Sequence, residues 1–341
     1  MSCCLVTGGA GFIGSHVVDH LIQMGNKVIV LDDLSGGYLE NVNKKAIFIE
    51  GSICDNILVD DVFKKYKFDY VFHLAAYAAE GLSHFIKRFN YTNNVIGSVN
   101  LINASINIGT VKCFIFTSSI AVYGENQTPM LESMEPLPQD PYGIAKYAVE
   151  LDLKETSEMF NVPYIIFRPH NVFGERQNIA DKYRNVLGIF INQAMKNEPF
   201  TLFGDGTQTR SFSYIKNIAK TIAESYSFPK AYNEIFNIGD SKPISVMNIG
   251  DIIARKMNVK PEYKFLDERK EVKHAFSSHE KVHKYFGSSN EIGIEEGLDR
   301  MINWALKKGS QCLTSFEGIE VTKNLPKSWK DIIDRDSKVF I

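Results

Sequence analysis

The stretch VTGGAGFIG, residues 6–14, decides how the N-terminal half of the chain folds. Its glycines Gly8, Gly11 and Gly14 join a short apolar run, Cys3–Thr7, to an amphipathic one. Without a Cβ, glycine accepts a tight turn and lets the backbone approach both a pyrophosphate and a neighbouring strand. The N–H groups of the following helical turn then face the anion. We therefore predict a strand, a glycine turn and a helix that together bind a dinucleotide.

Two carboxylates stand at the end of the next apolar run, Lys27–Asp32. Asp32 and Asp33 follow the glycines at roughly the 20-residue distance where an acidic side chain holds the adenosine ribose of a dinucleotide. A carboxylate there repels a 2′-phosphate, and no Arg or Lys follows in residues 34–37. We therefore predict NAD rather than NADP, with a turn role as the alternative for Asp33.

Short apolar runs alternate with amphipathic stretches along the first half of the chain. This alternation is typical of βα units, in which parallel strands form one sheet and helices cover its faces. We expect further strands over residues 46–50, 70–75, 113–118 and 164–168, and helices over 14–24, 93–108 and 142–160. The predicted fold class is α/β, a doubly wound, Rossmann-type parallel sheet with a smaller α/β lobe that binds the substrate.

The sequence changes character after about residue 170, where turn-rich segments separate shorter elements. We expect residues 1–170 to form the dinucleotide-binding domain, with a return segment at about 209–240. Residues 171–208 and 241–310 are expected to form the substrate-binding lobe.

Residues 311–341 follow the last predicted helix, which ends near Lys308. They include Trp329 and Phe340. Large aromatic side chains are mostly buried in folded proteins. We therefore expect this C-terminal extension to dock on the rest of the chain.

A tyrosine and a lysine are candidates for the chemistry. Tyr142 and Lys146 are four residues apart in a predicted helix and therefore lie on one face of it. A phenol with the usual pKa near 10 is a poor base at neutral pH, and a neighbouring ammonium group stabilises its charged form. Upstream, Ser118 and Ser119 end a predicted strand, where a hydroxyl could orient the same substrate oxygen. These residues indicate proton transfer from an alcohol, coupled to hydride transfer.

Six stretches carry a resemblance to a known family. They are TGGAGFIGSH (7–16), FHLAA (72–76), TSSIAVYG (117–124), PYGIAK (141–146), RPHNVFG (168–174) and LFGDGTQTRSF (202–212). Together they resemble the motifs of the extended short-chain dehydrogenase/reductases, in the nucleotide-sugar epimerase/dehydratase branch. The resemblance spans about residues 3–308, and it is greatest to the 4-epimerases of UDP-glucose and UDP-N-acetylglucosamine.

The resemblance implies a tightly held NAD, with Ser119 and Tyr142 on the reacting hydroxyl and Lys146 bridging the tyrosine and the nicotinamide ribose. It implies cofactor contacts by Gly8, Gly11, Phe12, Ile13, Gly14, Asp32, Asp33, Ser52, Ile53, Leu74, Ala75, Ala76, Asn93, Ser118, Tyr142 and Lys146. It implies substrate contacts by Ser119, Asn171, Asn185, Arg210 and Arg269, the last four at the diphosphate and base. No metal ion is expected.

Several positions depart from the family's usual pattern, among them Ser211, Lys216 and Asn217, which replace acidic residues that are common there. Ser52 stands where the family usually has an aspartate near the adenine. Ala78 replaces a lysine that touches the cofactor in many 4-epimerases. The segment around Arg269 is one residue shorter than the usual arginine-proline-glycine-aspartate.

The residues after Ser119 favour one reaction of this branch. Similar dehydratases place an aspartate and a glutamate there, and decarboxylases a glutamate at the second position, whereas Ile120 and Ala121 have no proton to offer. The remaining chemistry is oxidation of one sugar carbon and return of the hydride. We predict a 4-epimerase of a UDP-hexose. N-acetylated sugars are included because the small Ala275 falls where epimerases restricted to glucose and galactose have a bulky residue.

Three alternatives stay open. A 2-epimerase of nucleotide sugars would keep the same serine, tyrosine and lysine. A 4-ketoreductase would consume NADPH, whose 2′-phosphate Asp32 opposes. A non-catalytic, NAD-sensing protein on the same fold would have a broken catalytic set, whereas Ser119, Tyr142 and Lys146 are all present.

Charge and composition limit the classes of partner. The 38 Lys and Arg residues nearly balance the 40 Asp and Glu residues, for a net charge of -2, so we expect neither a nucleic-acid nor a membrane surface. No apolar run approaches the ~20 residues of a membrane span. The helices expected over 93–108 and 142–160 match those that form the dimer interface in relatives, so a homodimer is expected.

The five cysteines are scattered, and no pair has the spacing of metal ligands. A chain of 341 residues needs no disulfide to stabilise its core, so we expect free thiols in a reducing compartment. The N-terminus enters the first predicted strand without a basic and apolar leader. The predicted location is the cytoplasm.

Overall fold

The computed structural model describes residues 1–125, 127–181, 183, 185–268, 272–287, 292–312, 316, 318–327 and 329–330. At the N-terminus, strand β1 (Cys3–Thr7) leads through the glycine turn into helix α1 (Phe12–Gln23), and strand β2 (Lys27–Asp32) follows. Both strands have the predicted bounds. The helix starts earlier than predicted because Gly11, in an extended conformation, is its N-cap residue.

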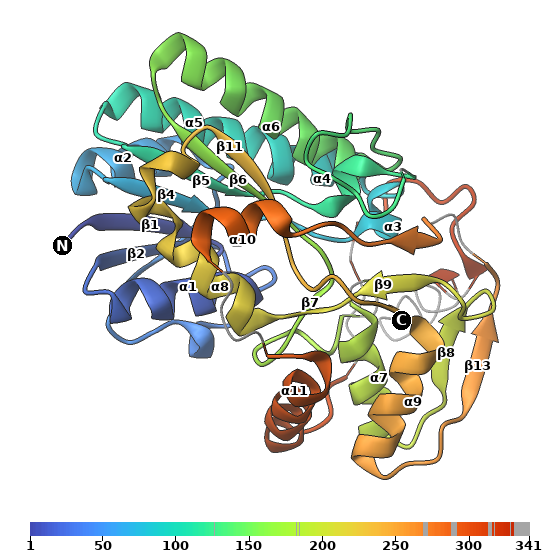
Figure 1. Ribbon diagram of the computed structural model, residues 1–341. Helices are drawn as coiled ribbons and strands as arrows, with labels where there is room; N and C mark the ends of the chain where they lie inside the picture. The colour runs from blue at the N-terminus through green and yellow to red at the C-terminus, as the bar shows by residue number, and fades with distance from the viewer. Residues whose placement is uncertain are drawn as a thin grey trace, which may run out of the picture.

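Among the described residues, the central sheet has seven parallel strands in the order β11-β6-β5-β4-β1-β2-β3 (Figure 1). Besides β1 and β2, these are β3 (Ile47–Glu50), β4 (Tyr70–His73), β5 (Cys113–Thr117), β6 (Tyr164–Pro169) and β11 (Glu234–Ile238). The chain adds strands outward from β1 to β3 and then continues from β4 in the opposite direction. Ligands of such sheets bind at the carboxyl ends of the strands where this reversal occurs. The prediction of a doubly wound α/β fold is confirmed.

Helices cover both faces of this sheet (Figure 1). One face carries α2 (Asn56–Tyr66), α5 (Gly97–Ile108) and α6 (Pro141–Phe160), and the other carries α1 and α8 (Ile215–Glu224). On β2, Val30 packs in the cluster of α1, whereas Ile29 and Leu31 pack in the cluster of α2 and α5. Each fully buried apolar side chain contributes roughly 1.5–3 kcal/mol, so hydrophobic burial holds both helical layers.

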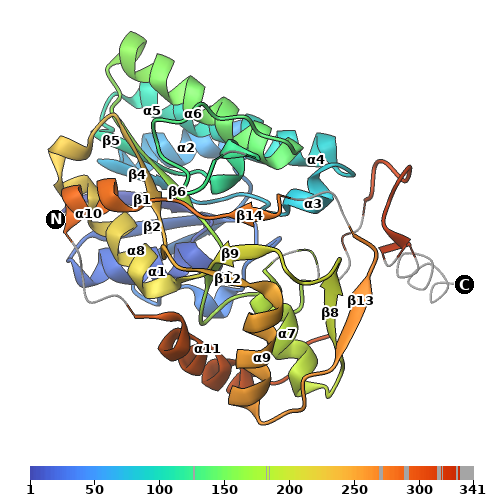
Figure 2. The ribbon, with the colours of Figure 1, turned by 45° about the vertical axis from the view of Figure 1, so that its right-hand side comes forward.

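A second group of elements lies beyond the carboxyl ends of the strands (Figure 2). It contains α7 (Val186–Met195), β8 (Phe200–Phe203), β9 (Thr209–Ser211), β12 (Pro243–Ser245), α9 (Val246–Met257), β13 (Tyr263–Leu266), β14 (His274–Ala275) and α11 (Ile294–Lys308). Strand β8 pairs with β13, and β9 pairs with β12 and β14. Phe190 of α7 stacks on Phe200 of β8 with ring centroids 4.8 Å apart. These contacts position β8 and β9 opposite the sheet.

Short elements connect the larger ones. They are α3 (Glu80–Ser83), α4 (Lys87–Tyr91), α10 (Glu280–Phe286), the two-residue strands β7 (Val172–Phe173) and β10 (Ser213–Tyr214), and single helical turns at Leu39–Asn41, Ile120–Tyr123, Ser225–Ser227 and Pro229–Ala231. A π-helical turn, Thr92–Ile96, precedes α5, so the helix predicted over 93–108 was wrong in its first turn. Within that turn Asn94 Nδ2 donates to the main-chain oxygen of Tyr77, and Asn94 Oδ1 accepts from its N–H. The Asn94 side chain therefore fixes the loop after β4, which leaves the sheet at His73.

Candidate active site

The glycine turn after β1 has room for a ligand because it has no side chains. Gly8 has a φ of +71°, which favours glycine, and a Cβ there would lie 2.7 Å from the nitrogen of Ala75. A Cβ on Gly14 would overlap the main-chain oxygen of Gly8. Gly11, the N-cap residue of α1, has no side chain to cap the helix, so the first N–H groups of α1 remain available to an anion at the pocket. This cradle fits a dinucleotide pyrophosphate.

The two carboxylates after β2 have different surroundings. Asp32 is 8% exposed and lines the pocket, where it accepts hydrogen bonds from Ala10 N–H at 3.0 Å and Leu34 N–H at 2.9 Å. Burial raises the pKa of its carboxyl group, and these hydrogen bonds oppose the change. Each oxygen keeps a further lone pair, which suits the hydroxyls of a ribose. Asp33 is exposed and accepts from the N–H and hydroxyl of Ser35, which is the turn role considered for it.

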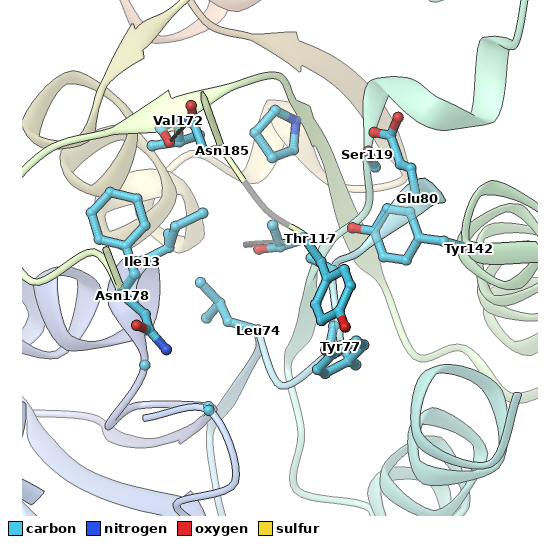
Figure 3. Close-up of a pocket in the computed structure, with 18 of the residues that line it drawn as sticks. Ile13, Leu74, Tyr77, Glu80, Thr117, Ser119, Tyr142, Val172, Asn178 and Asn185 are labelled. Carbon is cyan, nitrogen blue, oxygen red and sulfur yellow. Dashed lines mark hydrogen bonds between the residues drawn. The ribbon is translucent and has the colours of Figure 1, made fainter. Parts of the chain in front are cut away.

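The catalytic candidates meet at the carboxyl end of β5. Helix α6 starts beside that end, where Asp140 accepts from Gly143 N–H at 2.9 Å and caps it. Lys146 Nζ donates to the main-chain oxygen of Thr117 at 2.9 Å and lies 5.9 Å from the centroid of the Tyr142 ring. Burial lowers the pKa of Lys146 to about 7. Figure 3 shows Ser119 and Tyr142 on the same side of the pocket.

A buried ionic network lies directly behind these residues. Ser118 Oγ donates to Glu150 Oε1, and Arg168 donates from Nε and Nη2 to the two Glu150 oxygens at 2.9 and 2.5 Å. Arg168 Nη1 also donates to the hydroxyl of Tyr123 at 2.7 Å. Buried charges need such partners, because an uncompensated one is strongly destabilising. The network therefore fixes the strand end that carries Ser118 and Ser119.

One cavity of about 470 Å³ connects the glycine turn with the catalytic candidates. Its lining includes the predicted residues Gly8, Gly11, Phe12, Ile13, Gly14, Asp32, Asp33, Ile53, Leu74, Ala75, Ala76, Asn93, Ser118, Ser119, Tyr142, Lys146, Asn171, Asn185 and Arg210. Ser52 is not in the lining, and its hydroxyl accepts from Cys54 N–H at 3.3 Å. Arg269 lies outside the described residues. The structure thus brings nearly all the predicted residues to one place.

Comparisons with known proteins give the family of this chain. Residues 4–239 match the NAD dependent epimerase/dehydratase family. The chain belongs to that family. A putative UDP-glucose 4-epimerase of Methanocaldococcus jannaschii is 36% identical, over 88% of this chain and 97% of the relative.

Two solved structures of the epimerase/dehydratase family share its architecture. The UDP-glucose 4-epimerase of Thermotoga maritima, with UDP-glucose, has a TM-score of 0.84 at 36% identity, over 90% of this chain and 99% of that one. The UDP-N-acetylglucosamine 4-epimerase of Methanobrevibacter ruminantium, with UDP-N-acetylmuramic acid, has a TM-score of 0.84 at 35% identity, with the same coverage. The similarity therefore extends through nearly the whole length of these relatives.

Two of the predicted substrate residues, Asn185 and Arg210, line the cavity and form hydrogen bonds with main-chain atoms. Asn185 caps α7 by accepting from Leu187 N–H at 3.1 Å, and its Nδ2 donates to the main-chain oxygen of Val172 at 2.7 Å. Arg210, on β9, donates to the main-chain oxygens of Thr209, Val272 and Lys273. The guanidinium group is thereby fixed at the cavity wall.

Several lining residues of this epimerase/dehydratase site were missed by the sequence reasoning. Arg176, Gln177 and Asn178 reach the cavity from the loop after β7, and Phe89, Thr117, Gln139, Asp140, Tyr183, Thr201 and Gln208 also line it. Thr117 Oγ1 is buried there with no hydrogen-bond partner among the described residues. The polar run directly after the RPHNVFG motif was an available signal for Arg176 to Asn178.

Proposed function

We propose that this protein inverts the configuration at C4 of UDP-hexoses and uses bound NAD for that purpose. The observation that carries the proposal is the meeting of Ser119, Tyr142 and Lys146 in the cavity that also contains the glycine turn and Asp32. NAD bound there would supply reversible hydride transfer at the sugar carbon. The glycine turn would hold its pyrophosphate, and Asp32 its adenosine ribose.

The chain's own residues supply the proton chemistry. Tyr142 takes the proton of the C4 hydroxyl and gives it back to the ketone oxygen after the sugar has turned over. A positive charge on Lys146 stabilises the phenolate form of Tyr142. Ser119 Oγ accepts from Ala121 N–H at 3.1 Å, which leaves its own proton to orient the substrate oxygen.

The two residues after Ser119 do not provide the acid and base that similar dehydratases have at these positions. The two following residues, Ile120 and Ala121, form a helical turn with Val122 and Tyr123, and Ile120 is 7% exposed. Neither side chain can donate or accept a proton. Elimination requires a general acid near the leaving group, and these two positions supply none.

The choice of sugar rests on the relatives. Ala275 is not in the cavity lining, because it is buried against Ile120, Val122 and Met130, so its small size says nothing about an N-acetyl group. We propose UDP-glucose and UDP-galactose as substrates and their N-acetylated forms as further candidates, because the named relatives include both kinds of epimerase. Incubation of the purified protein with each of the four, and NMR of the products, tests this. Interconversion at C4 of any of the four UDP-sugars supports the proposal, and four unchanged UDP-sugars contradict it.

We also propose a homodimer. Helix α6 exposes Ile144, Leu151, Met159 and Phe160, whose side chains are 43–73% accessible. Ile144 and Leu151 are seven residues apart and therefore lie on one face of the helix, where neighbouring exposed apolar groups support a contact surface. Sedimentation equilibrium at micromolar concentration should give twice the chain mass, and the monomer mass would contradict the proposal.

Location and domain division are further proposals. Cys3, Cys4, Cys54, Cys113 and Cys312 are free thiols, which supports the cytoplasm as the compartment. No helix of the described part of the chain combines the length and the apolar character needed to cross a membrane. We keep residues 1–170 with about 209–240 as the cofactor domain and 171–208 with 241–310 as the substrate lobe, with β9 at the boundary because it pairs with β12 and β14 of the lobe. The participation of β11 in the central sheet supports this division.

A further inference from the structure

The residues Phe316, 318–327 and Trp329, here named the tail segment, lie beside α3 and α4 (Figure 2). The resemblance to the family ends near residue 308, and the relatives above match 88–90% of the chain. The epimerase reaction as described gives the tail segment no role. Its contacts nevertheless fall on side chains that line the cavity.

Phe316 supports two of these side chains from outside. Its ring lies 5.1 Å from the ring of Tyr77 and 4.9 Å from that of Phe89, measured between centroids. Tyr77 and Phe89 also contact each other edge to face at 5.2 Å, and both line the cavity. The three rings form one cluster whose inner members face the substrate side.

Trp329 supports a third lining residue. Its indole is 4% exposed and meets the ring of Tyr183 edge to face at 4.9 Å. On its other side it meets Phe85 at 6.0 Å. Leu325 is buried in the same cluster. The tail segment therefore joins the loop that carries Tyr183 to the chain between β4 and α4.

Glu320 fixes the start of α4. Its carboxylate accepts from Arg88 N–H at 2.8 Å and from Phe89 N–H at 2.9 Å. The N–H groups of Glu320 and Val321 donate in turn to the main-chain oxygen of Phe85. A carboxylate on the first N–H groups of a helix stabilises the helix start. Phe89 is thus held by its backbone as well as by its ring.

The same stretch of chain contacts the catalytic helix. Ser83 Oγ accepts from Tyr142 N–H at 3.2 Å, and Asn90 Nδ2 donates to the main-chain oxygen of Pro141 at 2.9 Å. Residues 77–91 therefore lie between the first turn of α6 on one side and the tail segment on the other. Figure 3 shows Tyr77, Glu80 and Tyr142 around the same part of the cavity.

We propose that the tail segment is the outer support of the sugar-side wall of the cavity, and that Phe316 and Glu320 are positioning residues for the sugar of the substrate. The proposal rests on the UDP-sugar function proposed above. The tail segment holds Tyr77, Phe89 and Tyr183 in place, so that the wall keeps one shape while the sugar turns over between the two hydride transfers. Its loss should therefore weaken binding of the sugar and leave the nucleotide and NAD in place.

The test compares Phe316→Ala and Glu320→Ala with Lys323→Ala, an exposed residue of the same segment. Calorimetry gives the Kd of UDP-glucose and of UDP, and kinetics give KM and kcat. We expect the Kd and KM of UDP-glucose to rise by about two- to tenfold in Phe316→Ala, the range for a lost aromatic pair. The Kd of UDP, the content of bound NAD and kcat should stay at the values of Lys323→Ala. Phe316→Tyr keeps the aromatic ring, so its Kd for UDP-glucose should equal that of the wild type.

Two results would overturn the proposal. One is a Kd for UDP-glucose in Phe316→Ala and Glu320→Ala equal to that of Lys323→Ala. The other is an equal loss of UDP, UDP-glucose and NAD, which would mean general loosening of the fold. If Phe316→Ala does not fold, Phe316→Leu gives the same comparison. A wild-type protein that binds UDP-glucose without inverting C4 would contradict the proposed function alone, because the Kd values still decide the role of the tail segment.

Discussion

Lys146 Nζ lies 2.9 Å from the main-chain oxygen of Thr117, and this hydrogen bond ties helix α6 to the end of strand β5. The ammonium group is therefore anchored to the sheet, and it lies 5.9 Å from the centroid of the Tyr142 ring. Burial lowers the pKa of Lys146 to about 7, while the charge of Glu150 opposes that change. Tyr142, the proposed proton acceptor, therefore lies beside the amino group of Lys146, whose pKa is about 7.

Replacing Tyr142 by Phe removes only the hydroxyl that exchanges the proton. We expect kcat to fall by about 10²- to 10⁴-fold, the usual contribution of a general base, while NAD stays bound. Turnover by NMR and NAD released on denaturation measure both quantities. Tyr147→Phe, on the same helix, should keep full activity. Turnover of Tyr142→Phe at the wild-type rate would rule out this residue as the base.

Asp32 and Asp33 provide a matched pair for the cofactor. Asp32→Asn should lower the affinity for NAD by about tenfold or more, the effect of losing a charged hydrogen-bond acceptor, and should reduce the preference over NADP. Asp33→Asn should do neither, because that carboxylate is exposed and bonds to Ser35. Reconstitution of the stripped protein with each cofactor gives the two affinities. If Asp33→Asn lowers the affinity for NAD and Asp32→Asn does not, Asp33 holds the ribose.

The buried pair of Glu150 and Arg168 should contribute mainly to stability. Glu150→Gln leaves the guanidinium group without its counter-charge, so we expect the free energy of unfolding to fall by about 3–5 kcal/mol. Glu158→Gln, at an exposed position of the same helix, should change it by less than about 0.5 kcal/mol. Urea unfolding followed by circular dichroism measures both. If Glu150→Gln and the wild type unfold at the same urea concentration, the ion pair does not stabilise the fold.

Two buried histidines should make the protein sensitive to acid. His170 Nε2 and His279 Nε2 are 2.9 Å apart, and burial lowers their pKa values to about 4 and about 3. Because the unfolded chain binds these protons near pH 6.5 and the folded chain does not, stability should fall as the pH drops from about 6.5 to about 4, by up to about 1.4 kcal/mol per pH unit for each group.

His279→Gln should reduce that pH dependence, whereas His274→Gln, at an exposed position, should leave it unchanged. Urea midpoints between pH 6.5 and 4.5 give the slopes. A slope in His279→Gln equal to that of the wild type would show that the pair does not titrate as described.

The sequence predicted the fold because its signals are local. The apolar runs at Cys3–Thr7 and Lys27–Asp32 are buried parallel strands with the expected bounds, and the glycine spacing located the turn between them. The spacing of Tyr142 and Lys146 likewise placed both on one face of α6. Such patterns need only neighbours in the chain, so they can be read before the fold is known.

The remaining features depend on contacts between distant residues. The order of strands, with β11 at the edge beside β6, follows from packing and not from any local pattern. Tyr77 lines the cavity in a position set by Asn94 and by Phe316, and neither contact has a signature in the sequence. Ala275 was misjudged in the opposite way. The resemblance to the family suggested a position near the sugar, whereas the structure buries this residue in a core cluster outside the cavity lining.

The most direct test of the central claim uses UDP-glucose deuterated at C4, incubated with the purified protein in ordinary water and without added cofactor. The mechanism returns the same hydrogen to the same carbon from the opposite face. UDP-galactose that retains the deuterium at C4 is the predicted result by NMR. Loss of the label to water, or inversion at another carbon, would contradict the account.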